Sequence, residues 1–231
     1  MRLERMRTSA TICIILSAMF GLWSSTGFCQ TPPTPAEASR YKALHAAAWN
    51  NKVARIRALL AAGADPKSVD GAGRSPLHVA TFRSHDDAVA ALIRGGADPN
   101  ALEHDKYDPI TIAAVANDPK LVALLVELGA SPRNITSVYD GTALIAAAHL
   151  GHVDVVKVLI AAGAPLDHVN NLGWTALIEA VVLGDGGANH VATVEALMNG
   201  GADKSIRDRN GKTPLMLARS RGYRAMIELL D

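Results

Sequence analysis

The stretch that decides the fold runs from Asp140 to Ala164, DGTALIAAAHLGHVDVVKVLIAAGA. Thr142 opens an apolar helix that we expect to end near Leu150, where a glycine-containing turn follows. A second helix is predicted over Val153 to Ala162, because its apolar residues gather on one face. Gly163 then stops it, since glycine tolerates the left-handed backbone of a helix C-terminus. Neither short helix buries its apolar face alone, so the stretch predicts neighbouring copies of itself.

Copies of this unit follow one another along the chain. Gly-Ala pairs that end a second helix begin at Gly63, Gly96, Gly129, Gly163 and Gly201, in steps of 33, 33, 34 and 38. The helix openers keep the same spacing: Ser75-Pro76-Leu77-His78, Asp108-Pro109-Ile110, Thr142-Ala143-Leu144, Thr175-Ala176-Leu177 and Thr213-Pro214-Leu215. This period and this opener resemble the ankyrin repeat. The resemblance covers about Ala38 to Asp231 and implies an all-α solenoid of six helix-turn-helix pairs with β-hairpin-like finger loops.

The period sets the boundaries of the repeat domain and of its six repeats. We expect a repeat domain over 39–231, with repeats at about 39–69, 70–102, 103–136, 137–169, 170–207 and 208–231. Repeat three lacks the usual opener, which leaves its finger geometry open, although Pro119 suits the first turn of its second helix. Repeat five carries an insertion within Leu183 to Asn189, whose three glycines predict a flexible loop between its helices.

The N-terminus is a different kind of sequence. Three arginines precede the uncharged apolar run Ile12 to Trp23, and small polar residues follow it, a pattern typical of a secretory signal peptide over residues 1–29. The cut is expected before Gln30, with Phe28 as an alternative start; an uncleaved anchor and a lipid-modified Cys29 are the other interpretations. The run is shorter than a membrane-spanning helix, so the mature protein is expected in the periplasm or outside the cell, without a stable span. Residues 30–38 are proline-rich and predict a stiff linker.

Charge and cysteine content argue against several classes of function. Residues 1–29 hold three arginines and one glutamate, so the rest of the chain has 20 basic against 21 acidic residues. This balance does not favour nucleic acid as a ligand. The repeats contain no cysteine, which argues against a thiolate metal site or a catalytic cysteine. No nucleophile or phosphate-loop motif is complete, so we expect no catalytic residues and no cofactor.

The histidines have a structural interpretation. In ankyrin-like repeats the opener histidine bonds to backbone and the neighbouring loop, and we assign His45 and His78 this role. His152 and His190 occupy the Gly-His turn of the repeat, and His85 is equivalent to them. His149 lies close before His152 in the sequence, but a zinc site would need further ligands, so no metal is expected.

With catalytic and metal sites not expected, the candidate functional feature is a protein-binding surface. In the ankyrin fold the first helices and the finger loops line a concave groove, and the resemblance implies a partner site there. The expected groove residues are Trp49, Phe82, His149, Leu150 and Val182 near the ends of first helices, Glu179 on a first helix, and Arg74, Tyr107, Tyr139, Leu172, Trp174 and Lys212 on fingers. Aromatic and arginine clusters favour binding hot spots. In the alternative interpretation Trp49 and Phe82 cover repeat junctions and Trp174 lies flat on its own finger.

The sequence therefore predicts an exported, non-enzymatic, monomeric module that binds another protein through its groove. Its fingers resemble those of exported bacterial ankyrin proteins, which are generally inferred to be interaction or protective modules. The alternatives are an inhibitor or immunity protein that blocks a secreted toxin enzyme, a protective factor for a periplasmic enzyme and, with little support, an enzyme.

Overall fold

The computed structural model describes residues 30–231, so the predicted signal peptide lies outside the described residues. Within that range the chain forms thirteen α-helices and no β-strand, and Thr136 and Gly141 form an isolated bridge. The helices are α1 Pro35–Ala38, α2 Ala43–Trp49, α3 Val53–Ala61, α4 Pro76–Phe82, α5 Asp86–Arg94, α6 Pro109–Val115, α7 Pro119–Glu127, α8 Ala143–His149, α9 Val153–Ala161, α10 Ala176–Val182, α11 Ala188–Asn199, α12 Pro214–Arg221 and α13 Arg224–Leu230. The all-α class predicted from the sequence is confirmed.

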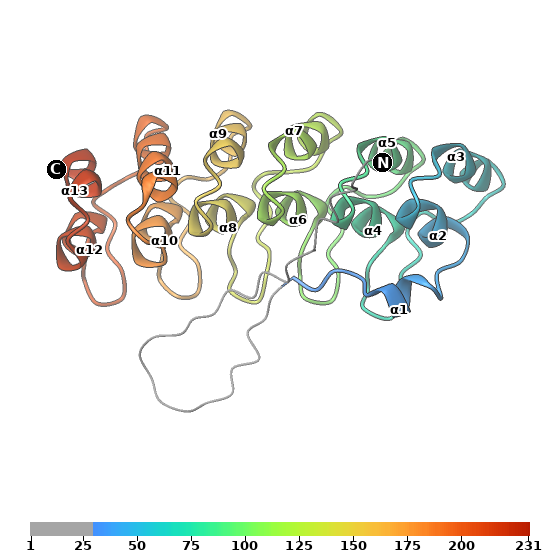
Figure 1. The fold of residues 1–231 in the computed structure, drawn as a ribbon, viewed down its shortest axis with the longest axis horizontal. Coiled ribbons are helices and arrows are strands. Elements are labelled where there is room, and N and C mark those ends of the chain that lie inside the picture. Colours follow the sequence, from blue (N-terminus) through green and yellow to red (C-terminus); the bar gives the residue numbers. More distant parts are fainter. Residues whose placement is uncertain (1–29) are drawn as a thin grey trace, which may run out of the picture. The chain divides into compact units, whose positions relative to one another are not determined.

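Twelve of these helices form six pairs that stack side by side (Figure 1). The first helices α2, α4, α6, α8, α10 and α12 make one row, and the second helices α3, α5, α7, α9, α11 and α13 make the other. Each helix packs on its own partner and on the same helix of the next pair. The finger loops, which lead into each first helix, project from the first row. This is a solenoid in which every repeat depends on its neighbours for burial.

Polar caps fix where the first helices begin. The side chains of Ser75, Asp108, Thr142, Thr175 and Thr213 each accept a hydrogen bond from the backbone N–H three residues on. Such a cap satisfies a helix N–H that lacks a helical partner. Lys42 precedes α2 and makes no side-chain cap. At the other end of each unit, the glycines at 63, 96, 129, 163 and 201 all have positive φ, between 81° and 97°.

The apolar residues that define the repeat are the core. Leu44, Leu77, Ile110, Leu144 and Leu177 occupy the same place in successive first helices, and none is more than 2% exposed. Burying a side chain of this size contributes about 1.5–3 kcal/mol. Because these residues lie between adjacent pairs, the stabilisation belongs to the stack and not to one repeat.

Repeat three keeps the common geometry without the common opener. Lys106 adopts a left-handed backbone (φ 62°) where fingers two and five have Gly73 and Gly173. Asp108 replaces the capping serine or threonine. Pro119 is the first residue of α7, as expected. The finger is therefore formed normally, with backbone strain at one lysine.

The insertion in repeat five becomes a loop and an extra helical turn. α11 has twelve residues, whereas α3, α5, α7 and α9 each have nine. The glycines expected to give flexibility instead permit close approach: a Cβ on Gly186 would lie 2.6 Å from the ring of Tyr223, and one on Gly184 would lie 2.2 Å from the carbonyl oxygen of Ala180. The hydroxyl of Tyr223 also donates to the carbonyl of Gly184. The loop is thus packed against repeat six.

The segment predicted as a stiff linker contains helix α1. Thr34 and Glu37 form a capping box around it, and Glu37 also forms an ion pair with Arg74 of finger two. The linker residues from Pro32 on therefore form part of the same compact unit as the repeats. No helix within residues 30–231 is long and apolar enough to cross a membrane.

Candidate protein-binding surface

A row of half-buried side chains runs along the ends of the first helices. Trp49, Phe82, Val115, His149 and Val182 are the last residues of α2, α4, α6, α8 and α10, and each is partly accessible. Four of the five are apolar. His149 in the middle of the row is the exception, and its surroundings differ from those of the other four.

The imidazole of His149 bonds to Glu179 of repeat five, and Asn170 of the same repeat holds Glu179 in place. Nδ1 of His149 lies 2.9 Å from Oε2 of Glu179 on α10. The other oxygen of that carboxylate, Oε1, accepts a hydrogen bond of 2.9 Å from the amide of Asn170 on finger five. Glu179 is only 4% exposed, and the His149 side chain is 17% exposed. The network fixes the orientation of a partly accessible imidazole at the junction of repeats four and five.

The carboxylate of Glu179 stands where the repeat has an apolar residue. The equivalent positions, four residues after each cap, are Val79, Ile112, Ala146 and Leu217. Burying an ionised group is costly unless hydrogen bonds replace its water, and here both oxygens are engaged. The stack does not require this pair, since four other repeats do without one. Such local departures from a fold's own pattern concentrate at functional sites.

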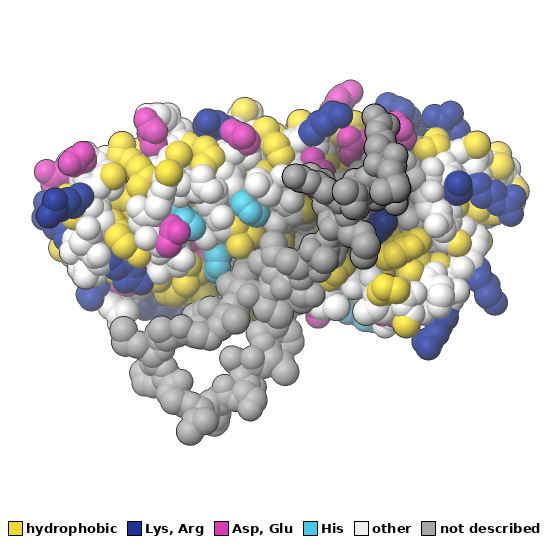
Figure 2. All heavy atoms as spheres, in the orientation of Figure 1, with side chains coloured by type: hydrophobic (Ala, Val, Ile, Leu, Met, Phe, Trp, Pro, Cys, Tyr) yellow, Lys and Arg dark blue, Asp and Glu magenta, His cyan; other side chains and the backbone are white. Residues whose placement is uncertain are grey.

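A hollow of about 350 Å³ lies beside this network. Its lining residues are Leu150, Asp185, Gly187, Ala188, Asn189 and His190. Nδ1 of His190 lies 3.0 Å from Asp185, and its Nε2 lies 3.0 Å from the carbonyl oxygen of His149. Histidine and acidic side chains gather over the region of α8 to α11 (Figure 2). The inserted loop thus forms one wall of the hollow, and the groove residue Leu150 forms another.

Finger five places two further predicted residues at the surface. Asn170 Oδ1 accepts hydrogen bonds from the backbone N–H groups of Leu172 and Trp174, at 3.0 Å each. Both side chains are half-buried, and Trp174 packs against the core cluster. Tyr139 on finger four is half-buried as well, and Lys212 on finger six is exposed. Trp174 therefore contributes to packing as well as to the surface.

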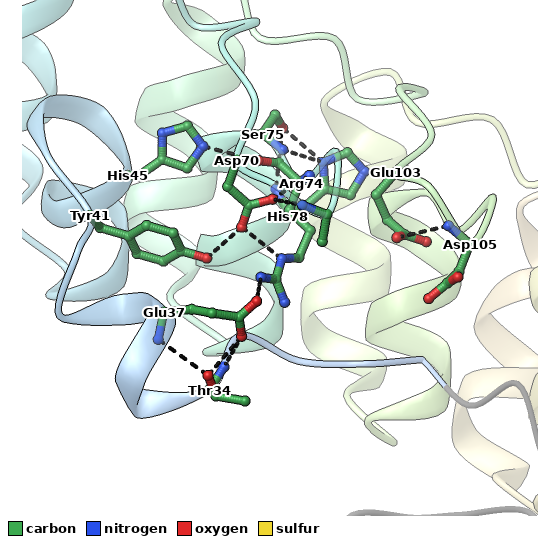
Figure 3. A network of polar contacts seen from close by, with 11 residues as sticks. Thr34, Glu37, Tyr41, His45, Asp70, Arg74, Ser75, His78, Glu103 and Asp105 are labelled. Carbon is green, nitrogen blue, oxygen red and sulfur yellow. Dashed lines mark hydrogen bonds and ion pairs between the residues drawn. The ribbon is translucent and has the colours of Figure 1, made fainter. Parts of the chain in front are cut away.

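Three predicted contact residues are buried, which corrects the expectation that they are accessible. Glu179 is described above. Tyr107 is 8% exposed, and Arg74 is 1% exposed. Figure 3 shows Arg74 between Asp70 and Glu37, with Nε 2.8 Å from Asp70 and Nη2 2.7 Å from Glu37. Arginine at this finger position thus joins helix α1 to finger two and is not offered to a partner.

The electrostatics of this network follow from its contacts. Burial acts to raise the pKa of Asp70, but hydrogen bonds from Tyr41 and Arg74 outweigh it, and the pKa lies below its ordinary value. Burial and the same hydrogen bond raise the pKa of Tyr41. The hydrogen bonds from Thr34 lower the pKa of Glu37. At neutral pH the two carboxylates are therefore ionised, and Tyr41 keeps the proton that it donates to Asp70.

The N-terminal aromatic residues also pack on one another. The ring of Tyr41 meets Trp49 edge-on at 6.3 Å, and the guanidinium of Arg83 lies 4.6 Å from the centre of the Trp49 ring. Trp49 thus covers the junction of repeats one and two while keeping a partly accessible edge, and Phe82 follows it in the row.

The structural interpretation of the histidines is confirmed. His45 and His78 bond to the carbonyls of Arg74 and Ala101 in the following fingers. The turn histidines His85, His152 and His190 bond back to the carbonyls of Ala48, Ala114 and His149. Among residues 30–231, no three His, Cys, Asp or Glu side chains are grouped to hold a metal ion.

The sequence did not single out Asn170 or Glu37. Asn170 could have been found by aligning the first residue of each finger: Asp70, Glu103, Asn170 and Asp208 all accept two backbone hydrogen bonds from their own finger. Glu37 precedes Asp70 by one repeat period. The alignment does not predict the role of Glu37, which lies in helix α1 and accepts hydrogen bonds from Thr34.

Comparison with known proteins gives the same account of the fold. A family model for three ankyrin repeats matches residues 44–136 and again residues 110–208. The crystal structure of an ankyrin repeat domain from Acinetobacter baumannii AYE is 41% identical, with a TM-score of 0.77, and the match covers 81% of this chain and 95% of that one. The ankyrin repeat protein EF0377 is 33% identical, with a TM-score of 0.76, and the match covers 82% and 98% of the two chains.

Among curated relatives, the ankyrin repeat protein YahD of Escherichia coli K12 is 41% identical over 98 residues. That match covers 42% of this chain and 49% of YahD, so the chain spans about half the length of this relative. The period, the caps, the stacked pairs and these matches agree, and the chain belongs to the ankyrin repeat family.

Proposed function

We propose that the chain is exported and that its groove binds another protein at the junction of repeats four and five, around His149. Ankyrin repeats are generally non-enzymatic protein-interaction modules, and residues 1–29 have the pattern of a secretory signal peptide. The proposed contact residues are His149, Leu150 and Val182 on the first helices, with Leu172 and Trp174 on finger five.

The observation that carries this proposal is the pair of His149 and Glu179. Both residues replace apolar ones of the repeat, and the buried carboxylate is fully hydrogen-bonded. One nitrogen of His149 bonds to that carboxylate, and the imidazole keeps part of its surface accessible. An oriented polar group beside apolar surface and a hollow is the arrangement that gives a protein interface its specificity.

The test is capture of a partner from periplasmic extract by the immobilised protein, followed by affinity measurements on the purified partner. His149→Phe with Glu179→Val copies Phe82 and Val79, the residues at the same two positions of repeat two, so the double variant leaves no unpaired carboxylate buried and should fold normally. We expect it to weaken partner binding by at least tenfold. Lys157→Ala, on the exposed side of α9, should bind as the unchanged protein does. Equal affinity for both variants would place the interface elsewhere.

Export has a separate test. N-terminal sequencing of the protein from its native cells should give a chain that starts near Gln30 in the periplasmic or extracellular fraction. An intact Met1 on a cytosolic protein would contradict this part of the proposal without affecting the groove.

A further inference from the structure

Exposed large apolar side chains form a regular series on the fingers. Within residues 30–231 they are Val69, Leu102, Ile135, Val169 and Met216, with exposures of 60%, 47%, 56%, 45% and 47%. The first four recur in steps of 33, 33 and 34, so they occupy one position in four successive fingers. Each directly precedes the residue that begins the finger turn. We call these four residues the finger stripe.

Met216 has a different explanation. It lies three residues after the cap of α12, at the position of Thr111, Ile145 and Ile178 in earlier repeats. Those residues are buried against the following repeat, and repeat six has no described repeat on that side. Met216 therefore provides a comparison of equal exposure outside the stripe.

The fingers that carry the stripe are joined to one another. The backbone N–H groups of His104, Ser137 and Asn171 donate to the carbonyls of Ala72, Lys106 and Tyr139 on the preceding fingers. Fingers two to five thus form one platform, on which the four aliphatic side chains follow in order. Isolated surface leucines and valines need no explanation, but a contiguous exposed row is typical of an interaction site.

The stripe ends at a cationic finger. The equivalent position in the next finger, finger six, holds Arg207. Arg209 and Lys212 are exposed beside it. Arg207 and Arg209 donate to the backbone carbonyls of Gly211 and Asn171. None of the three cations has a carboxylate partner among the described residues. A partner that follows the stripe therefore meets uncompensated positive charge at this end.

The spacing of the stripe fits a helical partner and argues against an extended strand. Neighbouring packed helices lie about 8–10 Å apart, so the stripe residues should recur at about that interval. Every seventh residue of an α-helix recurs at about 10.5 Å. Side chains on one face of a β-strand recur at about 6.8 Å and would lose register after one finger.

We propose that the finger stripe binds an amphipathic helix of a partner protein, with one apolar residue per seven and acidic residues at the end that lies over finger six. This inference rests on the proposed function, since it names the chemistry of the partner that the repeats bind. The four contacts span about 21 residues of helix, three intervals of seven. The acidic residues would pair with Arg207, Arg209 and Lys212.

Charge argues against a second copy of this chain as the occupant. Residues 97–199 hold twelve Asp and Glu against four Lys and Arg. Two chains packed stripe to stripe about a two-fold axis would bring these acidic segments together. A partner helix with acid only at one end avoids that repulsion.

Binding of labelled synthetic helices to the purified protein, followed by fluorescence anisotropy, tests the proposal. The first peptide has leucine at every seventh residue and three glutamates at one end. The second has three lysines in their place, the third has the same residues as the first with its leucines shuffled, and the fourth is proline-rich with leucine at every third residue. A free helix can lie in either direction, so acid at one end is sufficient. We expect the first peptide to bind at least tenfold more tightly than each of the others.

Variants then assign the contacts. Leu102→Ser with Ile135→Ser should weaken binding of the first peptide by at least tenfold, whereas Met216→Ser should leave it unchanged. Arg207→Glu with Lys212→Glu should reverse the preference between the glutamate and lysine peptides. Equal binding of the shuffled peptide, tighter binding of the proline-rich one, or no effect of the double serine variant would each overturn the inference. Concentration-dependent self-association lost on that substitution would assign the stripe to a second copy instead.

Failure here is distinguishable from failure of the proposed function. If a natural partner needs His149 but tolerates the double serine variant, the groove proposal stands and the stripe proposal is wrong. If the partner tolerates both changes, the groove proposal is wrong as well.

Discussion

Arg74 and Trp174 occupy the same position in two fingers and have different environments. Each stands between a glycine with positive φ and the residue that caps the following first helix. Arg74 is buried and paired with two carboxylates, one of them from helix α1. Trp174 is half-buried, and its ring packs on the core, with no cation over it among residues 30–231. One backbone geometry thus supports a structural ion pair in repeat two and a mainly apolar surface in repeat five.

The residue that begins each finger explains why both are tolerated. Asp70 accepts hydrogen bonds at Oδ1 from the backbone of Ala72 and Arg74, and Asn170 does the same for Leu172 and Trp174. The second polar atom of the side chain has different partners in the two fingers. Asp70 Oδ2 accepts hydrogen bonds from Tyr41 and Arg74, whereas Asn170 Nδ2 donates one to Glu179. The first residue of the finger fixes the turn through Oδ1. Its second polar atom bonds either to the preceding repeat, as in Asp70, or to the following helix, as in Asn170.

The first prediction tests whether the two regions unfold together. Leu144 lies between them and is fully buried, so Leu144→Ala should lower the free energy of unfolding by about 2–5 kcal/mol. Trp49 and Trp174 report on the two regions by fluorescence, each in a variant where the other is phenylalanine. Nearest-neighbour coupling should shift both denaturant midpoints. A shift confined to one tryptophan would mean that the regions are energetically independent.

The fold was predictable because the same sequence signals recur in successive repeats. Leu144 and its equivalents recur at one period, five of the six first helices follow a polar capping residue, and the five second helices before α13 are followed by a Gly-Ala pair. A repeat that departs from the pattern can still be located, because the repeats on either side keep the period. Helix α1 was missed because a four-residue helix has almost no periodicity, and its stability comes from a capping box and from an ion pair with Arg74, which is distant in the sequence.

The second prediction separates the regions by pH. Burial lowers the pKa of His78 in repeat two to about 4, from an ordinary value of 6.5, whereas Ile178 occupies the same place in repeat five. A lowered histidine pKa means that the unfolded chain takes up a proton between pH 6.5 and 4 while the folded chain does not. Stability is therefore fully present above pH 6.5 and falls as the pH drops towards 4, by up to about 3 kcal/mol.

Urea unfolding at several pH values measures this slope. His78→Ile should be less stable at pH 7, because it leaves the carbonyl of Ala101 without this partner. Its slope between pH 6.5 and 4 should be shallower, and the pKa of His152, which burial also lowers, should account for part of the slope that remains. His104→Ala, which removes an exposed histidine, should retain the slope. An unchanged slope in His78→Ile would assign acid sensitivity to another group.

The third prediction exchanges the two finger residues. Arg74→Trp leaves Asp70 and Glu37 without their shared cation and should cost about 2 kcal/mol, below the range for fully buried pairs because Glu37 is 40% exposed. Trp174→Arg loses apolar packing at a half-buried site and should cost about 1 kcal/mol. Equilibrium denaturation of both variants measures the difference. Equal costs would show that the position and not its partners determines the stability.

The candidate site was less predictable than the fold, for a physical reason. Position in the repeat correctly placed the row of Trp49, Phe82, His149 and Val182, since helix phase follows from the period. Position could not predict that Arg74 and Tyr107 are buried, because their exposure depends on side chains from other repeats and from α1. The finger stripe was visible in the sequence as four aliphatic residues at one period, but only exposure distinguishes such a series from core.

The smallest expected effect lies between the two regions, in finger three. Fingers two and five place Gly73 and Gly173 at the left-handed position, and a Cβ there would lie 2.4 Å from His104 or 2.5 Å from Arg209 of the following finger. Finger three has Lys106 in the same conformation. Left-handed backbone costs a non-glycine residue roughly 1–2 kcal/mol, and the extra freedom of glycine in the unfolded chain offsets part of that. Lys106→Gly should therefore stabilise the protein by about 0.5–1 kcal/mol, seen as a higher denaturant midpoint with an unchanged m-value. Gly173→Ala should have the opposite sign and a larger size, because strain and the contact with Arg209 add. If Lys106→Gly destabilises instead, the lysine side chain contributes more than its backbone strain costs, and finger three would be a third environment of its own.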